Sequence, residues 1–215
     1  MNPSRRLKKL HGSTNKRLVK LRANVSGVAL PVKPNDDMVV GWTIVETLNL
    51  WSGFLRAYYL SGAMRTKTTS GAIVSFRAVR FANKDAAVRF AIRKLKDSSF
   101  KKSPITRRDE PTWHDTGKFL NLQKAVNPTN IGQVYSAFST GTTFNQFLPT
   151  IRNFYAHRCD ETFRKATLVA VKLGLTTKPK LRPTNIVCSR LPTRPQNLIT
   201  DWLDEIRNVV DLLCS

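Results

Sequence analysis

Apolar residues recur at spacings of three and four along much of the chain, as expected for helices with one buried face. The longest run covers residues 38–64 and follows a helix-starting segment at residues 34–37. The apolar stripe of this run is Ile44, Val45, Leu48, Trp51, Phe54, Leu55, Tyr58 and Tyr59. Because aromatic residues on one helical stripe are typical of a core, we predict that this helix is the spine of a bundle.

Similar patterns predict further helices in the second half of the chain. They are expected at about residues 83–97, 117–126, 128–139, 149–160, 161–173 and 195–213. The break near residue 160 stays open, because an apolar face continues past it. Residues 72–81 predict one or two short strands, and Ile186 to Cys188 resemble a short extended piece. The expected fold class is therefore mainly α: a helical bundle with a basic insertion at about residues 65–115.

Positive charge dominates the composition. The 215 residues hold 36 Lys and Arg against 14 Asp and Glu, so the formal net charge is +22 and the pI about 10.7. A chain this basic is expected to bind a polyanion, and nucleic acid is the first expectation. No apolar run of about 18 residues and no signal peptide are readable, so we expect a soluble cytoplasmic protein with no membrane partner.

The cations are concentrated in two segments. Residues 1–33 contain nine Lys or Arg and no acid, which predicts a disordered arm that follows phosphates; a mitochondrial presequence has a similar composition. Residues 65–108 contain thirteen Lys or Arg and two acids, and we expect them to grip RNA, with a merely solvated charged face as the alternative. The expected nucleic-acid-binding residues are Arg5, Arg6, Lys8, Lys9, Arg89, Arg93, Lys94, Lys101, Lys102, Arg107 and Arg108. The expected organisation is this arm, at residues 1–33, followed by one helical domain at 34–215.

Candidate chemistry gathers at residues 148–158. Pro149 suits the first turn of a helix, which would then carry Arg152, Asn153 and His157. Asn153 and His157, four residues apart, share a face, whereas Arg152 and His157 are separated by about 140° and about 7.5 Å along the axis. One helix therefore cannot easily direct both side chains at one phosphate. A dimer with two-fold symmetry could, because each site would draw on both chains.

An Arg followed by a polar residue and, after four to six intervening positions, a His, on a helix of an all-α domain, resembles the HEPN superfamily. Residues 152–157 (RNFYAH) have this pattern with four residues between, and the resemblance covers about residues 38–64 and 118–213. It implies a metal-independent ribonuclease that works as a dimer. Many members are toxins or effectors of defence or toxin–antitoxin systems, which implies a restraining antitoxin or sensor protein. Other members only bind.

The spacing alone is not specific, because His11 and His114 also follow an Arg at a suitable distance. His157 differs in its context: an Asn directly after the Arg, a strong helix start and interleaved apolar residues. Cys159, two residues further on, would diverge from His157 by about 200° on a continuous helix, so a thiol nucleophile is not favoured. The three cysteines have no metal-ligand spacing, carboxylate clusters are absent, and we expect neither a metal nor a cofactor.

The expected mechanism needs few groups. Histidine can act as base or acid near neutral pH, so His157 would exchange protons with the 2′-hydroxyl or the leaving 5′-oxygen. Arg152 would stabilise the phosphorane, and Asn153 would orient the phosphate or the imidazole. The products would be a 2′,3′-cyclic phosphate and a 5′-hydroxyl, from RNA with tRNA as one candidate. Two alternatives remain open: a non-catalytic RNA- or DNA-binding subunit of a ribonucleoprotein or defence complex, and a basic structural protein of a ribosome or virion.

Overall fold

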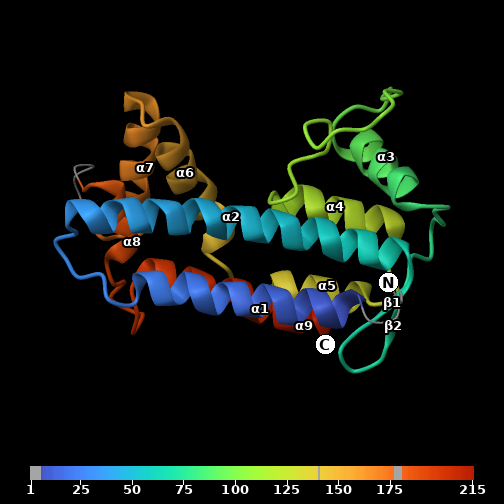
Figure 1. The fold of residues 1–215 in the computed structure, drawn as a ribbon, viewed down its shortest axis with the longest axis horizontal. Coiled ribbons are helices and arrows are strands. Elements are labelled where there is room, and N and C mark those ends of the chain that lie inside the picture. The colour runs from blue at the N-terminus through green and yellow to red at the C-terminus, as the bar shows by residue number, and fades with distance from the viewer. Residues whose placement is uncertain (1–5, 140, 177–180) are drawn as a thin grey trace. The chain divides into compact units, whose positions relative to one another are not determined.

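A computed structural model describes residues 6–139, 141–176 and 181–215 (Figure 1). These residues form nine helices and one two-stranded sheet, so the predicted mainly α class is confirmed for them. The elements are α1 (Arg6–Val25), α2 (Pro34–Ala63), β1 (Thr66–Lys67), β2 (Ile73–Val74), α3 (Lys84–Leu95), α4 (Thr116–Val126), α5 (Ile131–Phe138), α6 (Phe144–His157), α7 (Asp160–Lys172), α8 (Pro183–Cys188) and α9 (Leu198–Cys214).

The described residues divide into two compact units. The first unit contains residues 6–14, 51–139 and 209–215, and the second contains residues 15–50, 141–176 and 181–208. Helices α1, α2 and α9 therefore contribute residues to both units. The predicted insertion at residues 65–115 lies within the first unit.

The core of the first unit is built on the second half of α2, where the predicted stripe is buried. The rings of Trp51 and Phe54 stack with centroids 5.8 Å apart. Tyr58 packs against Phe119 of α4, and the Tyr59 hydroxyl donates to the carbonyl of Ala87 in α3 at 3.0 Å. These contacts hold α3 and α4 on α2.

The sheet of the first unit is smaller than the strand pattern predicted. Strands β1 and β2 pair antiparallel, with Thr66 opposite Val74 and Lys67 opposite Ile73. Of the predicted strand residues 72–81, only two lie in β2, and Phe76 forms an isolated bridge with Pro128. Gly71, with φ +95°, supplies the left-handed turn before β2.

The second unit places α6 by contacts from several helices. Helices α6 and α7 lie side by side as a helical hairpin (Figure 1). Gly41 of α2 lies directly under Tyr155 of α6, because a Cβ at Gly41 would be 2.5 Å from the Tyr155 ring. The Tyr155 hydroxyl is 2.8 Å from the hydroxyl of Thr184 in α8, which in turn bonds to Asp37 of α2. Helix α6 is therefore tied to both α2 and α8.

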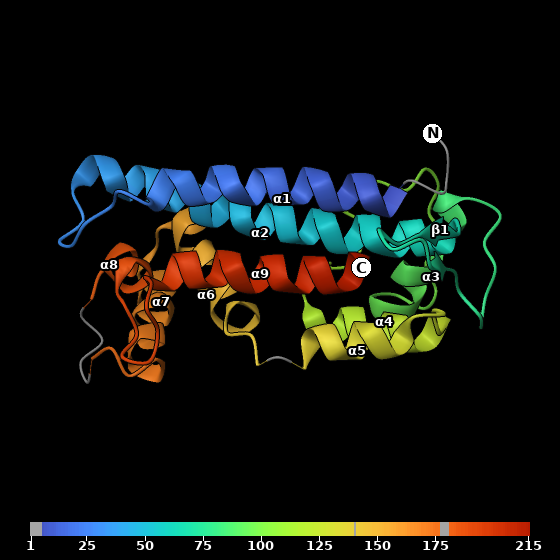
Figure 2. The ribbon, with the colours of Figure 1, turned by 90° about the horizontal axis from the view of Figure 1, so that it is seen from below.

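Residues 6–25 form helix α1, so the prediction of a disordered arm is wrong for them (Figure 2). Leu18, Leu21 and Val25 are buried at helical spacing. Within the second unit, Arg22 Nη1 lies 2.6 Å from Asp204 Oδ1 of α9. The apolar positions are too sparse among the cations to stand out in the sequence, and their burial depends on the other helices.

Two other boundaries differ from the predictions. Helix α6 begins at Phe144, and Pro149 lies inside it. The backbone N–H groups of Thr143 and Phe144 donate to the Glu205 carboxylate at 2.8 and 3.0 Å, which satisfies donors at the helix start. This partner is about 60 residues away in the chain, so no local pattern reveals it.

Ile186 to Cys188, predicted as extended, lie in α8, where Pro183 favours a helix start. No helix in the described ranges is long and apolar enough to span a membrane.

Candidate active site and basic surfaces

Arg152, Asn153 and His157 all lie on α6, in the second unit. Ile151 and Tyr155 face the core of the unit, whereas Arg152 is half-buried and the other two side chains are exposed. His157 is the last residue of the helix, because Arg158 has the left-handed conformation, with φ 45°. The structure thus brings the three predicted residues to the C-terminal part of one helix.

Arg152 has unused hydrogen-bonding capacity. Its Nη1 donates to Asn153 Oδ1 at the long distance of 3.5 Å. Its Nε is buried and has no acceptor among the described residues, which is costly for a charged group. No described carboxylate pairs with this guanidinium, so an anion from outside could satisfy it.

His157 is similarly unengaged. Within the described ranges, the imidazole makes no hydrogen bond and no ion pair with another side chain, and it is exposed. Both ring nitrogens are therefore accessible to a substrate. The separation expected for positions 152 and 157 holds, because both lie on one α-helix, and the two side chains alone do not close on one phosphate.

Cys159 does not lie on the same helix as His157, which differs from the prediction. The expected divergence from His157 assumed a continuous helix, but α6 ends at His157 and Cys159 is the N-cap of α7. Its exposed Sγ lies 3.5 Å from the Thr162 hydroxyl, and this hydrogen bond, with one from the Thr162 backbone, lowers the pKa of the thiol. Thr162 is thus the thiol's partner at the start of α7.

Several cations that were predicted to bind RNA form hydrogen bonds within the first unit, either between α3 and the loop at residues 98–110 or inside that loop. Arg89 Nη1 donates to the carbonyl of Lys102 at 3.0 Å, and Arg93 Nε donates to the carbonyl of Phe100 at the same distance. Lys102 Nζ lies 3.0 Å from both carboxylate oxygens of Asp109. These side chains have a structural partner in this unit.

Glu110 of this loop accepts hydrogen bonds from three residues, whereas Asp109 accepts from two. Arg56 donates to it through Nε at 2.6 Å and Nη2 at 2.8 Å, Trp113 Nε1 donates at 2.8 Å, and Arg107 lies 2.9 Å away. Its side chain is only 6% exposed. Burial alone would raise the pKa of Glu110, but the hydrogen bonds from Arg56 and Trp113 and the nearby arginine charges hold it below its ordinary value.

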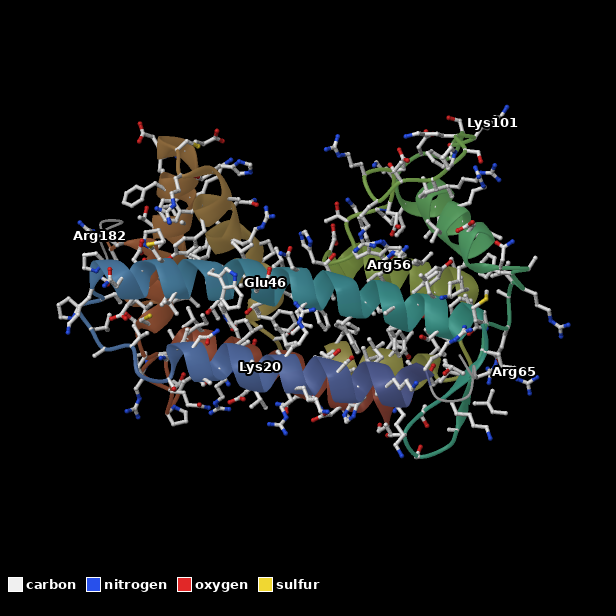
Figure 3. All side chains as sticks on the ribbon, in the orientation of Figure 1. Lys20, Glu46, Arg56, Arg65, Lys101 and Arg182 are labelled. Carbon is white, nitrogen blue, oxygen red and sulfur yellow. The ribbon has the colours of Figure 1, made fainter. Side chains whose placement is uncertain are left out.

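The remaining predicted cations are available for binding. Lys101, labelled in Figure 3, points away from the ribbon. Those that are exposed and have no side-chain partner in the described ranges are Lys8, Lys9, Lys94, Lys101 and Arg108. Arg6 is half-buried, and Arg5 lies outside the described residues.

The structure also groups some of the predicted cations with others that the sequence did not single out. Lys94 of α3 lines a groove of about 680 Å³ with Lys118 and Lys124 of α4. Arg6 and Lys9 of α1 line a cavity of about 370 Å³ with Arg56 of α2 and Lys84 of α3. Within each set, residues far apart in the sequence meet only through tertiary packing, so no local pattern could have grouped them.

Among the described residues, no group of three or more His, Cys, Asp or Glu side chains could hold a metal ion. Comparisons with protein-family models, with curated proteins and with solved structures find no match to this chain.

Proposed function

We propose that the chain is a metal-independent endoribonuclease of the HEPN type, acting as a toxin or effector in a defence or toxin–antitoxin system. The observation that supports this most is the end of α6. There, a guanidinium with a buried, unpaired Nε lies beside an amide and one turn from an unengaged imidazole. An activity of this kind needs a restraining antitoxin or sensor protein.

The chemistry follows from the properties of these three side chains. His157 takes the proton of the 2′-hydroxyl or supplies one to the leaving 5′-oxygen. Arg152 donates to the non-bridging oxygens, where negative charge builds in the transition state. Asn153, which accepts from Arg152, holds the guanidinium in position or orients the phosphate. The bonds break and form on the substrate itself, and the 2′-oxygen displaces the 5′-oxygen at phosphorus.

A second copy of the chain is the proposed partner that completes this site, because Arg152 and His157 diverge along one helix. The exposed apolar side chains of α2 support the dimer. Met38 is 70% exposed and Trp42 is 55% exposed, and both lie within one turn of Gly41, which contacts Tyr155 of α6. Met38 and Trp42 are four residues apart and therefore lie on one face of α2. Large apolar side chains that are exposed together are typical of an interface. A Trp42→Glu variant that stays dimeric in sedimentation would argue against it.

Products provide the test of the reaction class. The native chain should cleave purified tRNA or total RNA in EDTA and leave 2′,3′-cyclic phosphate and 5′-hydroxyl ends. RNA with a 2′-deoxy substitution at a mapped cleavage position should resist cleavage there, because the attacking oxygen is missing. Cleavage of the deoxy substrate at the same position would overturn the scheme.

A second candidate function is a non-catalytic RNA-binding subunit. The groove of Lys94, Lys118 and Lys124 favours it, because three lysines along a groove suit a phosphate backbone. Substitution of His157 separates the two functions. An enzyme would lose turnover and keep its RNA affinity, whereas a binding subunit would have no turnover to lose.

A further inference from the structure

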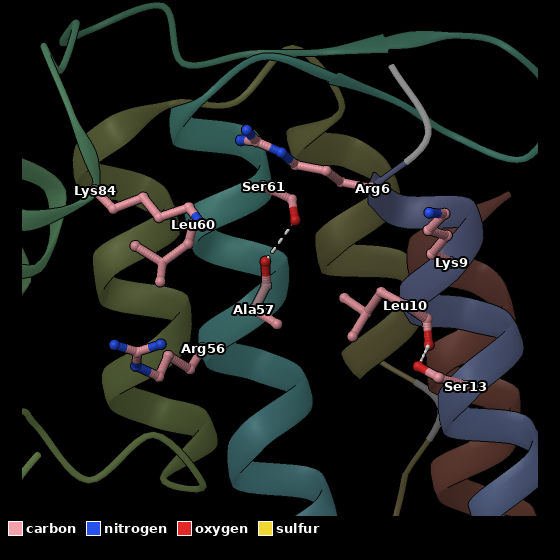
Figure 4. A pocket seen from close by; sticks show the side chains of 9 residues that line it. All are labelled: Arg6, Lys9, Leu10, Ser13, Arg56, Ala57, Leu60, Ser61 and Lys84. Carbon is pink, nitrogen blue, oxygen red and sulfur yellow. Dashed lines mark hydrogen bonds between the residues drawn. The ribbon is translucent and has the colours of Figure 1, made fainter. Parts of the chain in front are cut away.

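The first unit contains a cavity whose charged lining is entirely cationic. Arg6 and Lys9 of α1, Arg56 of α2 and Lys84 at the start of α3 line it, and no Asp or Glu does (Figure 4). Glu110 already pairs with Arg56, whereas Arg6, Lys9 and Lys84 have no described carboxylate partner, and like charges around one cavity favour a bound anion. The arrangement therefore suits a negatively charged ligand.

Two guanidinium groups in this cavity have hydrogen-bond donors to spare. Arg6 Nη1 is buried and has no acceptor among the described residues. Arg56 uses Nε and Nη2 on Glu110, and its Nη1 makes no hydrogen bond to a described residue. Lys9 and Lys84 pair with no described carboxylate. Phosphate oxygens are the acceptors that match such donors best.

Besides the cations, the lining contains apolar side chains, which indicate more than a bare phosphate. Leu10 of α1 and Ala57 and Leu60 of α2 line the cavity between the cations (Figure 4). Ser13 and Ser61 also line the cavity, but their hydroxyls donate to carbonyls of their own helices, so the cations are the free donors for a ligand. A volume of about 370 Å³ falls within the range of small-molecule sites.

We propose that this cavity binds a terminal phosphate carried by a nucleoside, with the phosphate on the four cations and the nucleoside on the apolar lining. The ligand is either a free nucleoside monophosphate or the 5′-phosphorylated end of an RNA. The site is separate from Arg152 and His157, and the proposal does not depend on the ribonuclease activity.

The test compares neighbouring lysines in the full chain. Binding of AMP, of a 5′-phosphorylated RNA hexamer and of the same hexamer with a 5′-hydroxyl is measured by calorimetry at fixed salt. Lys9→Ala and Lys84→Ala should each weaken binding of the phosphorylated ligands about tenfold, since each removes a charged contact. Lys16→Ala is the matched control, because Lys16 is exposed on the same helix, outside the cavity and not among the predicted nucleic-acid-binding residues.

The three affinities show whether the cavity is a binding site and, if it is, which ligand it binds. Binding of AMP identifies a free nucleotide as sufficient, and binding only of the phosphorylated hexamer identifies an RNA end. If Lys16→Ala weakens binding as much as Lys9→Ala, diffuse charge explains the affinity and the cavity is not a site. Equal affinity for the two hexamers with no AMP binding would also overturn the proposal. Circular dichroism of each variant shows that it is folded.

Discussion

The cations of α3 and its following loop and those at the end of α6 are of the same kinds, but their partners differ. Arg89, Arg93 and Lys102 bond to carbonyls or a carboxylate within the first unit. In the second unit, Arg152 has only a long contact to Asn153, and its Nε is buried without an acceptor. Charge density in a sequence therefore does not distinguish a cation that holds the fold from one that is free for a ligand.

The largest expected effect is on the α6 side of this comparison. Arg152→Ala should slow RNA cleavage by about 10² to 10³, because it removes a donor to the charge of the transition state. Arg164→Ala removes an exposed cation from neighbouring α7 and should leave the rate unchanged. Single-turnover cleavage at saturating protein measures both. Equal slowing by the two variants would mean that net charge, not the position of Arg152, matters.

The next effect is on the fold of the first unit. Glu110→Gln should destabilise the protein by about 2–3 kcal/mol, because it leaves the bidentate Arg56 with a neutral partner; the part exposure of Arg56 keeps the loss below that of a fully buried pair. Urea unfolding measures it. The control is Glu161→Gln, which breaks an exposed pair with Lys165 and should cause no measurable loss. A Glu110→Gln protein as stable as the native chain would contradict the structural role.

The contact between α2 and α6 fixes the position of α6 in the second unit, and its loss should lower stability. Gly41→Ala should destabilise the protein by about 1–2 kcal/mol, because the new methyl group would overlap the Tyr155 ring. Gly53→Ala lies on the same helix with nothing within 4 Å of the new Cβ, and should stabilise by up to about 1 kcal/mol through helix propensity. Thermal unfolding of both variants measures the difference. Equal shifts would show that Gly41 is not a packing position.

Removing free cations should change the salt dependence of RNA binding by a small amount. Lys94→Ala combined with Lys101→Ala should reduce the slope of log K against log salt by about 0.7 for each lysine that contacts a phosphate. Replacing both by Arg keeps the charge and should keep the slope. Titrations at several salt concentrations measure it, and an unchanged slope in the Ala variant would exclude these lysines from the interface.

The smallest expected effect is on acid stability. Hydrogen bonds from the Thr106 backbone and side chain, and from Lys102, lower the pKa of Asp109 from 3.8 to about 2. A lowered carboxyl pKa adds stability above the ordinary pKa, and this contribution is lost as the pH falls from about 4 to about 2. Asp109→Asn should remove that part of the acid dependence. Unfolding curves over this range would contradict the assignment if native and variant change in parallel.

Local patterns were enough to predict part of the fold. The apolar stripe of α2 was predicted correctly because its spacing is that of one helix face. The helix expected from about residue 83 was also correct, because the Asn83 side chain accepts from the Ala86 N–H at 2.9 Å, only three residues away. The start of α6 was not, since it depends on Glu205. Helix α1 was missed because its face is completed by other helices.

The candidate site shows the same limit. Residues 152–157 were predicted to share a helix, and they do. The partners of Arg89 and Arg93 could not be predicted, because carbonyl acceptors leave no pattern in the sequence. The cations around the cavity of the first unit come from three different helices, so no local sequence pattern could group them.

His157→Ala tests most directly whether the end of α6 cleaves RNA. One labelled tRNA is incubated in EDTA with saturating native or variant protein, and its affinity for each is measured in parallel. We predict cleavage by the native chain, a rate about 10² to 10⁴ lower for the variant, and equal affinities. Equal rates for the two proteins, or binding by the native chain without cleavage, would contradict the claim.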